Sequence, residues 1–175
     1  MLETLTTNRL ILRPFHMGDA TDLVRLINDY EVSKWLTRVS HPYSILEAHW
    51  FIAALSNPWR FAITSRATGA LMGSIEIGSE FGYWLGRAHW RQGYMSEAAQ
   101  AVIDHWMGQY GDSLVSSYLL GNAGSKAILT ALGFEQGDIT LKYAQVQQKE
   151  VEARTLTLTP ARYHAHKAPR AIPRA

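Results

Sequence analysis

The sequence predicts an α/β (α+β) fold, with strands and helices in the order β-α-α-β-β-β-α-β-α-β-β. Three segments in the middle of the chain, 59–64, 71–77 and 81–85, alternate apolar and polar residues with the period of β-strands. Short turns at residues 68–69 and 78–79 separate them, which indicates antiparallel neighbours. Apolar residues then recur at helical spacing after residue 94. We therefore expect helices that flank one central sheet.

The first 57 residues are expected to supply one strand and two helices. Residues 9–15 predict the strand, and Asp19 is a plausible N-cap for the first helix. Residues 30–43 are expected to be irregular. Ser44 and Glu47 form a capping-box pattern ahead of the second helix. The apolar residues expected on these two helices are Leu23, Leu26, Ile27, Phe51, Ala54 and Leu55.

The second half of the chain is expected to hold two further helices and three strands. A strand at 114–120 follows the first of these helices, and Asn122 begins the next one. Gly133 stands where a left-handed residue would end that helix. The last strands are expected at about 138–147 and 151–159. The apolar residues at helical spacing after residue 94 are Met95, Ala98, Ala99, Val102 and Trp106.

Length and composition are typical of one globular domain. The 175 residues are 47% apolar and 18% charged, which allows a normal core. We expect a single domain at residues 1–163 and a basic, flexible tail at residues 164–175. The formal net charge of +2 is too small to argue for a nucleic-acid partner.

Composition and motifs also exclude several classes of protein. The chain has no cysteine, which excludes disulfides and cysteine nucleophiles and suits a cytoplasmic protein. No apolar run is long enough to span a bilayer, so no membrane role is expected. The seven histidines lack ligand spacing, and no metal is expected. Neither a Gly-Lys-Ser/Thr motif nor a complete Gly-x-Gly-x-x-Gly motif is present to indicate a P-loop or a Rossmann site.

The most informative segment is 82–100, which predicts a strand, a glycine-bounded loop and the start of a helix. The first amides of a helix have no intrahelical partner, and the helix dipole is positive at that end. Together they form a site for an anion. Two other segments accompany it: Asn122–Ser125, followed by Gly133 and Phe134, and the opening stretch Thr7–Pro14, which reads Thr-Asn-Arg-Leu-Ile-Leu-Arg-Pro.

These three segments, in this order, resemble the GNAT superfamily of acyl-CoA N-acyltransferases. The similarity is greatest to the RimJ/RimL-like branch, which contains the ribosomal-protein alanine N-acetyltransferases, and it covers about residues 7–160. The resemblance implies a mixed, mostly antiparallel sheet, splayed between its fourth and fifth strands. It also implies that acetyl-CoA is the co-substrate and that the acceptor is a primary amine, either a protein N-terminus or a small molecule.

In the family, a loop of the form Gln/Arg-x-x-Gly-x-Gly/Ala binds the CoA pyrophosphate. Gly93 fills the middle glycine position, whereas Met95 stands where a small residue is usual. The Met95 side chain can point into the core, because the contacts come from backbone amides. The residues that the resemblance assigns to the cofactor are Tyr83, Trp84, Leu85, Arg91, Gln92, Gly93, Tyr94, Met95, Ser96, Asn122 and Ser125.

The catalytic residues are less clearly marked. The resemblance places Ser125 near the thioester sulfur, although it could equally be a helix N3 residue, and Asn122 a plain N-cap. Glu76 is the candidate base, with Glu80 as the other carboxylate; either could be a solvated strand residue, and a water chain without a dedicated base is a third option. The residues expected to contact the amine are Trp35, Tyr43, Glu80 and Tyr143.

Two hypotheses about function remain. The first is an N-acetyltransferase in which the amine attacks acetyl-CoA directly in a ternary complex. The second is a GNAT-fold protein that binds acyl-CoA without catalysis, as a sensor or interaction module, because a fold does not guarantee an activity. Either protein could be a monomer or a homodimer.

Overall fold

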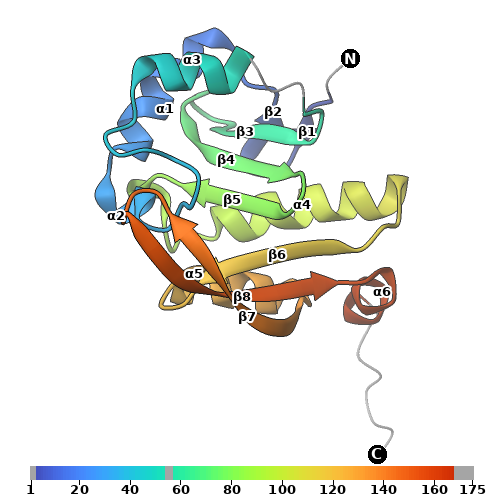
Figure 1. Ribbon diagram of the computed structural model, residues 1–175. Helices are drawn as coiled ribbons and strands as arrows, with labels where there is room; N and C mark the ends of the chain where they lie inside the picture. Colours follow the sequence, from blue (N-terminus) through green and yellow to red (C-terminus); the bar gives the residue numbers. More distant parts are fainter. Residues whose placement is uncertain (1–2, 54–56, 168–175) are drawn as a thin grey trace, which may run out of the picture.

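A single sheet organises the described residues, which are 3–53 and 57–167 of the computed structural model (Figure 1). Its eight strands lie in the order β1-β2-β3-β4-β5-β6-β8-β7. All neighbours pair antiparallel except β5 and β6, which are parallel. The strands are β1 (Leu5–Thr6), β2 (Leu10–Arg13), β3 (Arg60–Ser65), β4 (Leu71–Ile77), β5 (Phe81–Leu85), β6 (Leu114–Leu119), β7 (Glu135–Ala144) and β8 (Lys149–Leu158).

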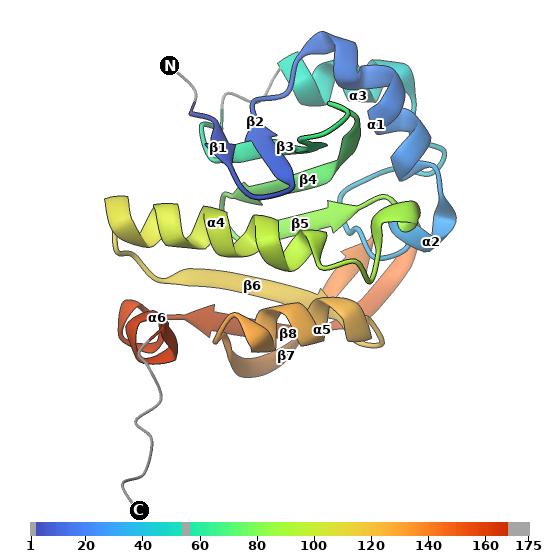
Figure 2. The same ribbon diagram turned by 180° about the vertical axis from the view of Figure 1, so that it is seen from behind.

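Helices cover the sheet in two groups. Figure 2 shows α4 and α5 on one face of the sheet, and α1 and α3 together at the β2–β4 end. None of the helices in the described ranges is long and apolar enough to cross a membrane. The helices are η1 (Met17–Asp19), α1 (Ala20–Ile27), α2 (Tyr30–Ser33), α3 (Ile45–Ala53), η2 (Arg87–His89), α4 (Tyr94–Gln109), α5 (Ala123–Ala131) and α6 (Pro160–Lys167).

The middle of the sheet is buried on both faces. Phe61 and Ile63 belong to the core under α4, whereas Ala62, between them on β3, belongs to a second core under α1 and α3. In β4 every residue except Glu76 is buried. The strand expected at residues 71–77 is therefore confirmed, and both sets of its alternating residues are buried because helices cover both of its faces.

Several local predictions are confirmed. Ser44 and Glu47 form the expected capping box, since Glu47 N donates to Ser44 Oγ at 3.2 Å and Ser44 N donates to Glu47 Oε2 at 2.8 Å. The Asn122 side chain caps α5, and Gly133 has a φ of +90° just after that helix. Of the apolar residues expected on the second helix, Ala54 and Leu55 lie outside the described residues.

Asp19 corrects one prediction. It precedes α1, but its side chain makes no capping hydrogen bond to that helix. Its carboxylate instead accepts two 2.8 Å hydrogen bonds from the Arg13 guanidinium and one of 3.0 Å from His16 N. A partner on β2 thus competes successfully with the local cap.

The boundary of the basic tail also needs correction. Residues 164–167, expected to be flexible, continue α6. Lys167 Nζ lies 2.7 Å from Asp104 Oδ2 on α4, and His166 Nε2 lies 2.8 Å from the Ala131 carbonyl oxygen on α5. These contacts attach α6 to the domain, and residues 168–175 lie outside the described residues.

The sheet opens between β5 and β6, as the family resemblance implies for the fourth and fifth predicted strands. The parallel ladder has one pair, Phe81 with Ser116, and Ser116 Oγ donates to Phe81 O at 2.8 Å. Within the described residues, the two strands have no further ladder partners towards Leu85 (Figure 1). This leaves one edge of β5 free in the middle of the sheet.

Candidate active site

The loop between β5 and α4 exposes a row of backbone amides. Gly93 has a φ of +78° and Arg91 a φ of +59°, so the chain turns twice through the left-handed region. Within the described residues, no acceptor contacts the amides of residues 91–96, and the first helical bond of α4 is Glu97 N to Gly93 O at 3.1 Å. Successive free amides at a helix start form a site for an anion.

The side chains around this loop leave the amides accessible. Met95 is 5% exposed and packs into the core under α4, which confirms the prediction that its side chain points inward. Arg91, Gln92 and Ser96 are exposed. Trp90 Nε1 donates to Leu85 O at 2.7 Å and thereby ties the loop to the end of β5.

The free edge of β5 carries the amides of Tyr83 and Leu85. Gly86 N donates to Met72 O of β4 at 2.8 Å. Hydrogen-bonded pairs alternate along an antiparallel ladder, so Trp84, two residues earlier, also directs its amide to β4. Tyr83 and Leu85 therefore direct theirs towards β6, the open side. Of the three residues expected to bind cofactor from this strand, Tyr83 and Leu85 have the suitable backbone orientation.

A pair of hydroxyl groups lies across the opening. Tyr83 Oη on β5 is 3.0 Å from Ser125 Oγ on α5, and either group can be the donor. Ser125 N donates to Asn122 Oδ1 at 3.0 Å, which fixes the first turn of α5. Burial raises the pKa of Tyr83 to about 12, although its bond to Ser125 has the opposite effect. The tyrosine therefore keeps its proton at neutral pH.

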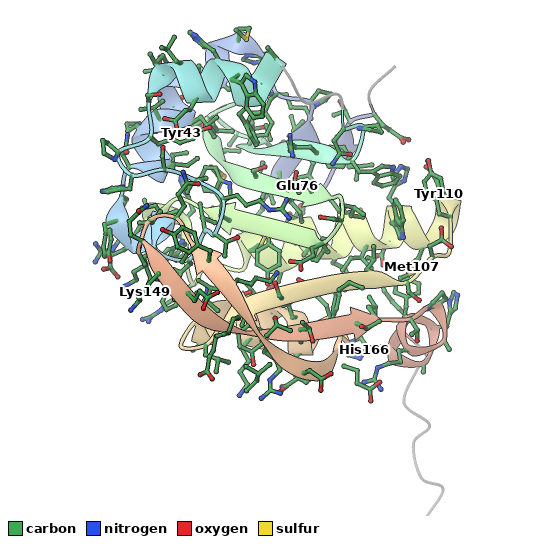
Figure 3. The ribbon with its side chains drawn as sticks, in the orientation of Figure 1. Tyr43, Glu76, Met107, Tyr110, Lys149 and His166 are labelled. Carbon is green, nitrogen blue, oxygen red and sulfur yellow. The ribbon has the colours of Figure 1, made fainter. Side chains whose placement is uncertain are left out.

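Glu76 and Glu80, the candidate carboxylates, are both ion-paired. Arg60 Nε donates to Glu76 Oε2 at 2.5 Å across the β3–β4 ladder. Glu80 accepts from Lys142 Nζ at 2.6 Å and from Ser117 Oγ at 2.8 Å. Partial burial raises the pKa of Glu80, but these two contacts lower it more, and the net pKa is below the ordinary value. Figure 3 shows Glu76 near the centre of the sheet.

The lowered pKa of Glu80 gives a pH-dependent prediction. A carboxylate whose pKa is lower in the folded state stabilises the fold above its unfolded pKa, and this contribution is lost as the pH falls through the folded pKa. The stability advantage of the wild type over Glu80→Gln should therefore be present at about pH 6 and shrink towards about pH 3. Urea unfolding at several pH values measures this difference.

Asp22→Asn is the matched control for Glu80→Gln. Asp22 pairs with Arg25 at 2.9 Å, but the two side chains are 47% and 64% exposed. Exposed pairs contribute little to stability, so this variant should differ little from the wild type at either pH. If the difference in unfolding free energy between the wild type and Glu80→Gln did not change with pH, the prediction would be contradicted.

A cavity of about 440 Å³ lies where α2 meets the β7–β8 hairpin. Gln147 Nε2 donates to Lys34 O at 2.8 Å, and Gln145 N donates to Thr37 O at 3.2 Å, so the hairpin is fastened to the segment after α2. Figure 3 shows Lys149 at this end of the molecule. The cavity is lined by Tyr30, Lys34, Trp35, Leu119, Leu120, Gln147, Lys149, Glu150, Val151 and Glu152.

The four residues expected to contact the amine do not meet in one place. Trp35 lines the cavity, and a Cβ built on Gly121 would lie 3.6 Å from its ring. Tyr43 is 7% exposed and belongs to the core under α1 and α3, where burial raises its pKa to about 12. Tyr143 is exposed, with its hydroxyl 3.3 Å from Gln148 Oε1. Glu80 is bound to Lys142 and does not line the cavity.

Sequence reasoning missed two features of the site. The Tyr83 hydroxyl has no local sequence signal, because its contact with Ser125 spans 42 residues. The role of the β7–β8 turn was also missed, because its glutamines contact a segment more than a hundred residues away. Within residues 3–53 and 57–167, no three His, Asp or Glu side chains are grouped to hold a metal ion.

Comparison with known proteins identifies the family of this chain. The model of the GNAT acetyltransferase domain matches residues 9–135. The uncharacterized N-acetyltransferase p20 of Bacillus licheniformis is 26% identical over an alignment of 176 positions. The alignment covers 93% of this chain and 99% of that protein.

Solved structures share the fold over nearly the whole chain. A GNAT-family acetyltransferase from Bacillus anthracis has a TM-score of 0.79 at 17% identity, covering 91% of this chain and 99% of its own. The ribosomal-protein-S5-alanine acetyltransferase of Vibrio fischeri has a TM-score of 0.77 at 16% identity, covering 92% and 98%.

The matched family model and the curated relative identify the class of this protein as an acetyltransferase. Because the family model spans most of the chain, the protein belongs to the GNAT family. The family's acetyl donor is acetyl-CoA, and the exposed amides beside Gly93 suit an anionic group such as its diphosphate.

Proposed function

We propose that this protein transfers the acetyl group of acetyl-CoA to a primary amine by direct attack in a ternary complex. One observation carries the proposal: the free amides of residues 91–96, the free edge of β5 and the Tyr83–Ser125 hydroxyl pair follow one another along the opening of the sheet. Acetyl-CoA has its parts in the matching order: the anionic diphosphate, then the linear pantetheine arm, then the thioester.

The backbone supplies the binding contacts. The amides of residues 91–96 bind the diphosphate, and the edge of β5 pairs with the pantetheine arm, with Asn122 at the start of α5 beside it. A backbone amide of Tyr83 or Leu85 donates to the thioester oxygen as negative charge develops there. The co-substrate supplies an activated acyl group; the protein supplies its orientation and the exclusion of water.

The hydroxyl pair serves the leaving group. The Tyr83 hydroxyl lies 3.3 Å from the Ser125 carbonyl oxygen, to which it donates, and 3.0 Å from Ser125 Oγ. In this proposal Ser125 Oγ donates to Tyr83 Oη, and the phenolic hydrogen turns from the Ser125 carbonyl oxygen to the sulfur when acetyl-CoA is bound. A thiol pKa is about 8.5, well below the pKa of about 12 of Tyr83, so the tyrosine stabilises the thiolate by a hydrogen bond and does not lose its proton. Ser125 then orients the tyrosine.

The amine enters from the cavity at α2 and the β7–β8 hairpin. Trp35 offers an apolar wall, and the lining also holds two carboxylates that can bind an ammonium group, Glu150 and Glu152, beside two lysines, Lys34 and Lys149. Glu76 and Glu80 would each have to release a cation before accepting a proton. This favours deprotonation of the amine through water, the route that needs no dedicated base.

Thiol release tests the proposal. The protein is incubated with acetyl-CoA and a panel of amines: N-terminal peptides, including ribosomal ones, polyamines and aminoglycosides. Turnover with any of them supports acetyl transfer and names the acceptor class. Calorimetric binding of acetyl-CoA without turnover on the whole panel would support the sensor hypothesis. Absence of heat with acetyl-CoA would overturn both. The cytoplasmic location and the oligomeric state stay predictions.

A further inference from the structure

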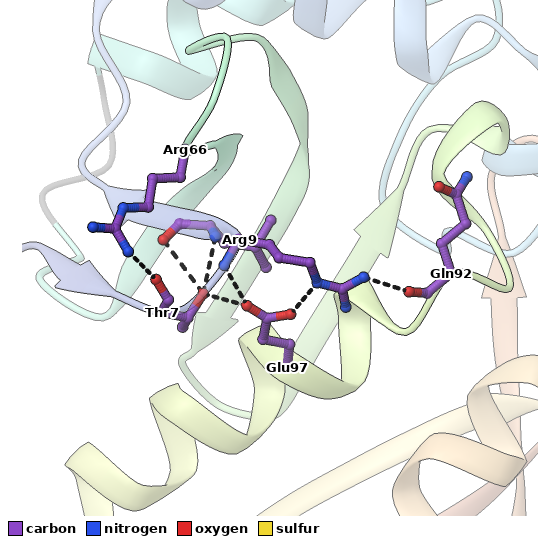
Figure 4. Close-up of polar contacts among 6 residues, drawn as sticks. Thr7, Arg9, Arg66, Gln92 and Glu97 are labelled. Carbon is purple, nitrogen blue, oxygen red and sulfur yellow. Dashed lines mark hydrogen bonds and ion pairs between the residues drawn. The ribbon is translucent and has the colours of Figure 1, made fainter.

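The opening stretch Thr7–Pro14 has a structural partner that the proposed function does not use. The turn between β1 and β2 lies beside the start of α4, so residues near position 8 meet residues near position 95 (Figure 4). The contacts are made by Thr7 and Arg9 on one side and by Gln92 and Glu97 on the other.

Arg9 joins the anion loop to the first turn of α4. Its Nη1 donates to Gln92 O at 2.9 Å, and its Nε donates to Glu97 Oε2 at 2.7 Å. The guanidinium carbon lies 4.4 Å from the centroid of the Tyr94 ring. A planar guanidinium that binds a carbonyl, a carboxylate and an aromatic face at once has one orientation.

Glu97 is held as firmly as Arg9. Its Oε1 accepts from Thr7 Oγ1 at 2.6 Å and from Arg9 N at 2.8 Å. Partial burial raises the pKa of Glu97, but the hydrogen bonds from Thr7 and Arg9 lower this pKa by more than burial raises it. The net pKa of Glu97 is therefore below its usual value. The carboxylate is therefore ionised at neutral pH, within the first turn of the helix whose free amides face the anion site.

These contacts have two consequences for the loop. The Gln92–Gly93 peptide is planar and trans, so a carbonyl held towards Arg9 directs the Gly93 amide to the opposite side. In addition, an uncompensated Glu97 charge would repel a diphosphate bound at the same helix start. Arg9 supplies the opposite charge at 2.7 Å.

We infer that Arg9 is a positioning residue for the anion site: it aims the Gly93 amide and neutralises Glu97 without contacting the bound group. This inference rests on the proposed function, because the anion is taken to be the diphosphate of acetyl-CoA. Thr7 completes the arrangement by holding the second oxygen of Glu97. The turn between β1 and β2 thereby contributes to co-substrate affinity and not to the chemistry of transfer.

Substitutions at Arg9 test this in the full-length protein. Arg9→Gln should raise the KM for acetyl-CoA about 10- to 30-fold, with kcat within about threefold, because only binding is affected. It should also weaken binding of inorganic pyrophosphate, measured by calorimetry. Arg9→Lys keeps the positive charge but loses the planar guanidinium with its several donors, so its KM should lie between those of Arg9→Gln and the wild type. Adding Glu97→Gln to Arg9→Gln should recover several-fold of the lost affinity.

Arg66→Gln is the matched control. Arg66 belongs to the same contact network, but its Nη1 donates only to Thr7 O, at 3.2 Å, and does not reach the loop (Figure 4). Its KM should stay within about twofold of the wild type. If Arg9→Gln is too unstable to assay, Arg9→Lys carries the test.

The outcomes separate the two proposals. An active wild type together with an Arg9→Gln or Arg9→Lys variant of unchanged KM would overturn the inference and leave the proposed function standing. A parallel loss of kcat in the Arg9 and Arg66 variants would show a merely structural role and would also overturn it. A wild type that binds neither acetyl-CoA nor pyrophosphate would overturn both proposals.

Discussion

Replacing Gly93 with valine should lower the affinity for acetyl-CoA by at least about 100-fold. Gly93 has a φ of +78°, a conformation that a β-branched residue strongly avoids. A Cβ there would also lie 3.3 Å from Arg9 Nη2, so the contact that holds the Gln92 carbonyl would shift. Each lost hydrogen bond to a charged group costs about 1.5–3 kcal/mol, and two such losses give this factor. Calorimetry with acetyl-CoA measures it.

Gly111→Val separates loss of the site from backbone strain. Gly111 follows the other end of α4 with a φ of +65°, and a Cβ there would meet only Met107 O, at 3.8 Å. This variant should lose stability to a similar extent while keeping its affinity for acetyl-CoA. Micromolar affinity in Gly93→Val would argue against the loop as the diphosphate site.

Tyr83→Phe should reduce kcat about 10- to 100-fold while changing the KM for acetyl-CoA little. The substitution keeps the ring and removes the hydroxyl that lies 3.0 Å from Ser125 Oγ. A hydrogen bond to a developing thiolate is worth about 1.5–3 kcal/mol, which corresponds to this range of rates. Ser125→Ala should have a milder effect, because a water molecule can orient the tyrosine in its place. Initial rates of thiol release measure both.

Tyr163→Phe is the control for the loss of a hydroxyl. Tyr163 donates to Asp104 Oδ1 at 2.8 Å on α4, and burial also raises its pKa to about 12. The chemical change is the same, but it lies outside the opening of the sheet, so kcat should be that of the wild type. Equal turnover of Tyr83→Phe and the wild type would remove Tyr83 from the mechanism.

Features set by short-range chemistry were predictable from the sequence. The capping box at Ser44, the Asn122 cap and the left-handed residue at Gly133 each depend on atoms within a few residues of one another. The strands at 71–77 and 81–85 are predictable for the same reason, because the turns and the alternating pattern that indicate them lie within a few residues. The anion loop followed from glycine placement beside a helix start.

Features set by distant partners were not predictable. Asp19 has the sequence context of a cap, yet Arg13 takes its carboxylate. Nothing near Glu80 in the sequence indicates an ion pair. Its partner Lys142 lies on β7, 62 residues later, and reaches Glu80 only in the folded chain. Strand β1 and helix α2 are too short for any periodicity to reveal, with two and four residues. Their existence depends on pairing and packing formed only in the folded chain.

The fastening of Gln145 and Gln147 to the segment after α2 has a consequence for synthesis on the ribosome. The loop of free amides and the start of α5 are complete once about residue 131 has emerged, whereas one wall of the cavity comes from Lys149–Glu152. During vectorial translation the half that would receive the acyl donor is thus finished before the half that would receive the amine. A nascent chain halted between these two points would have a complete donor half and an acceptor cavity with one wall missing.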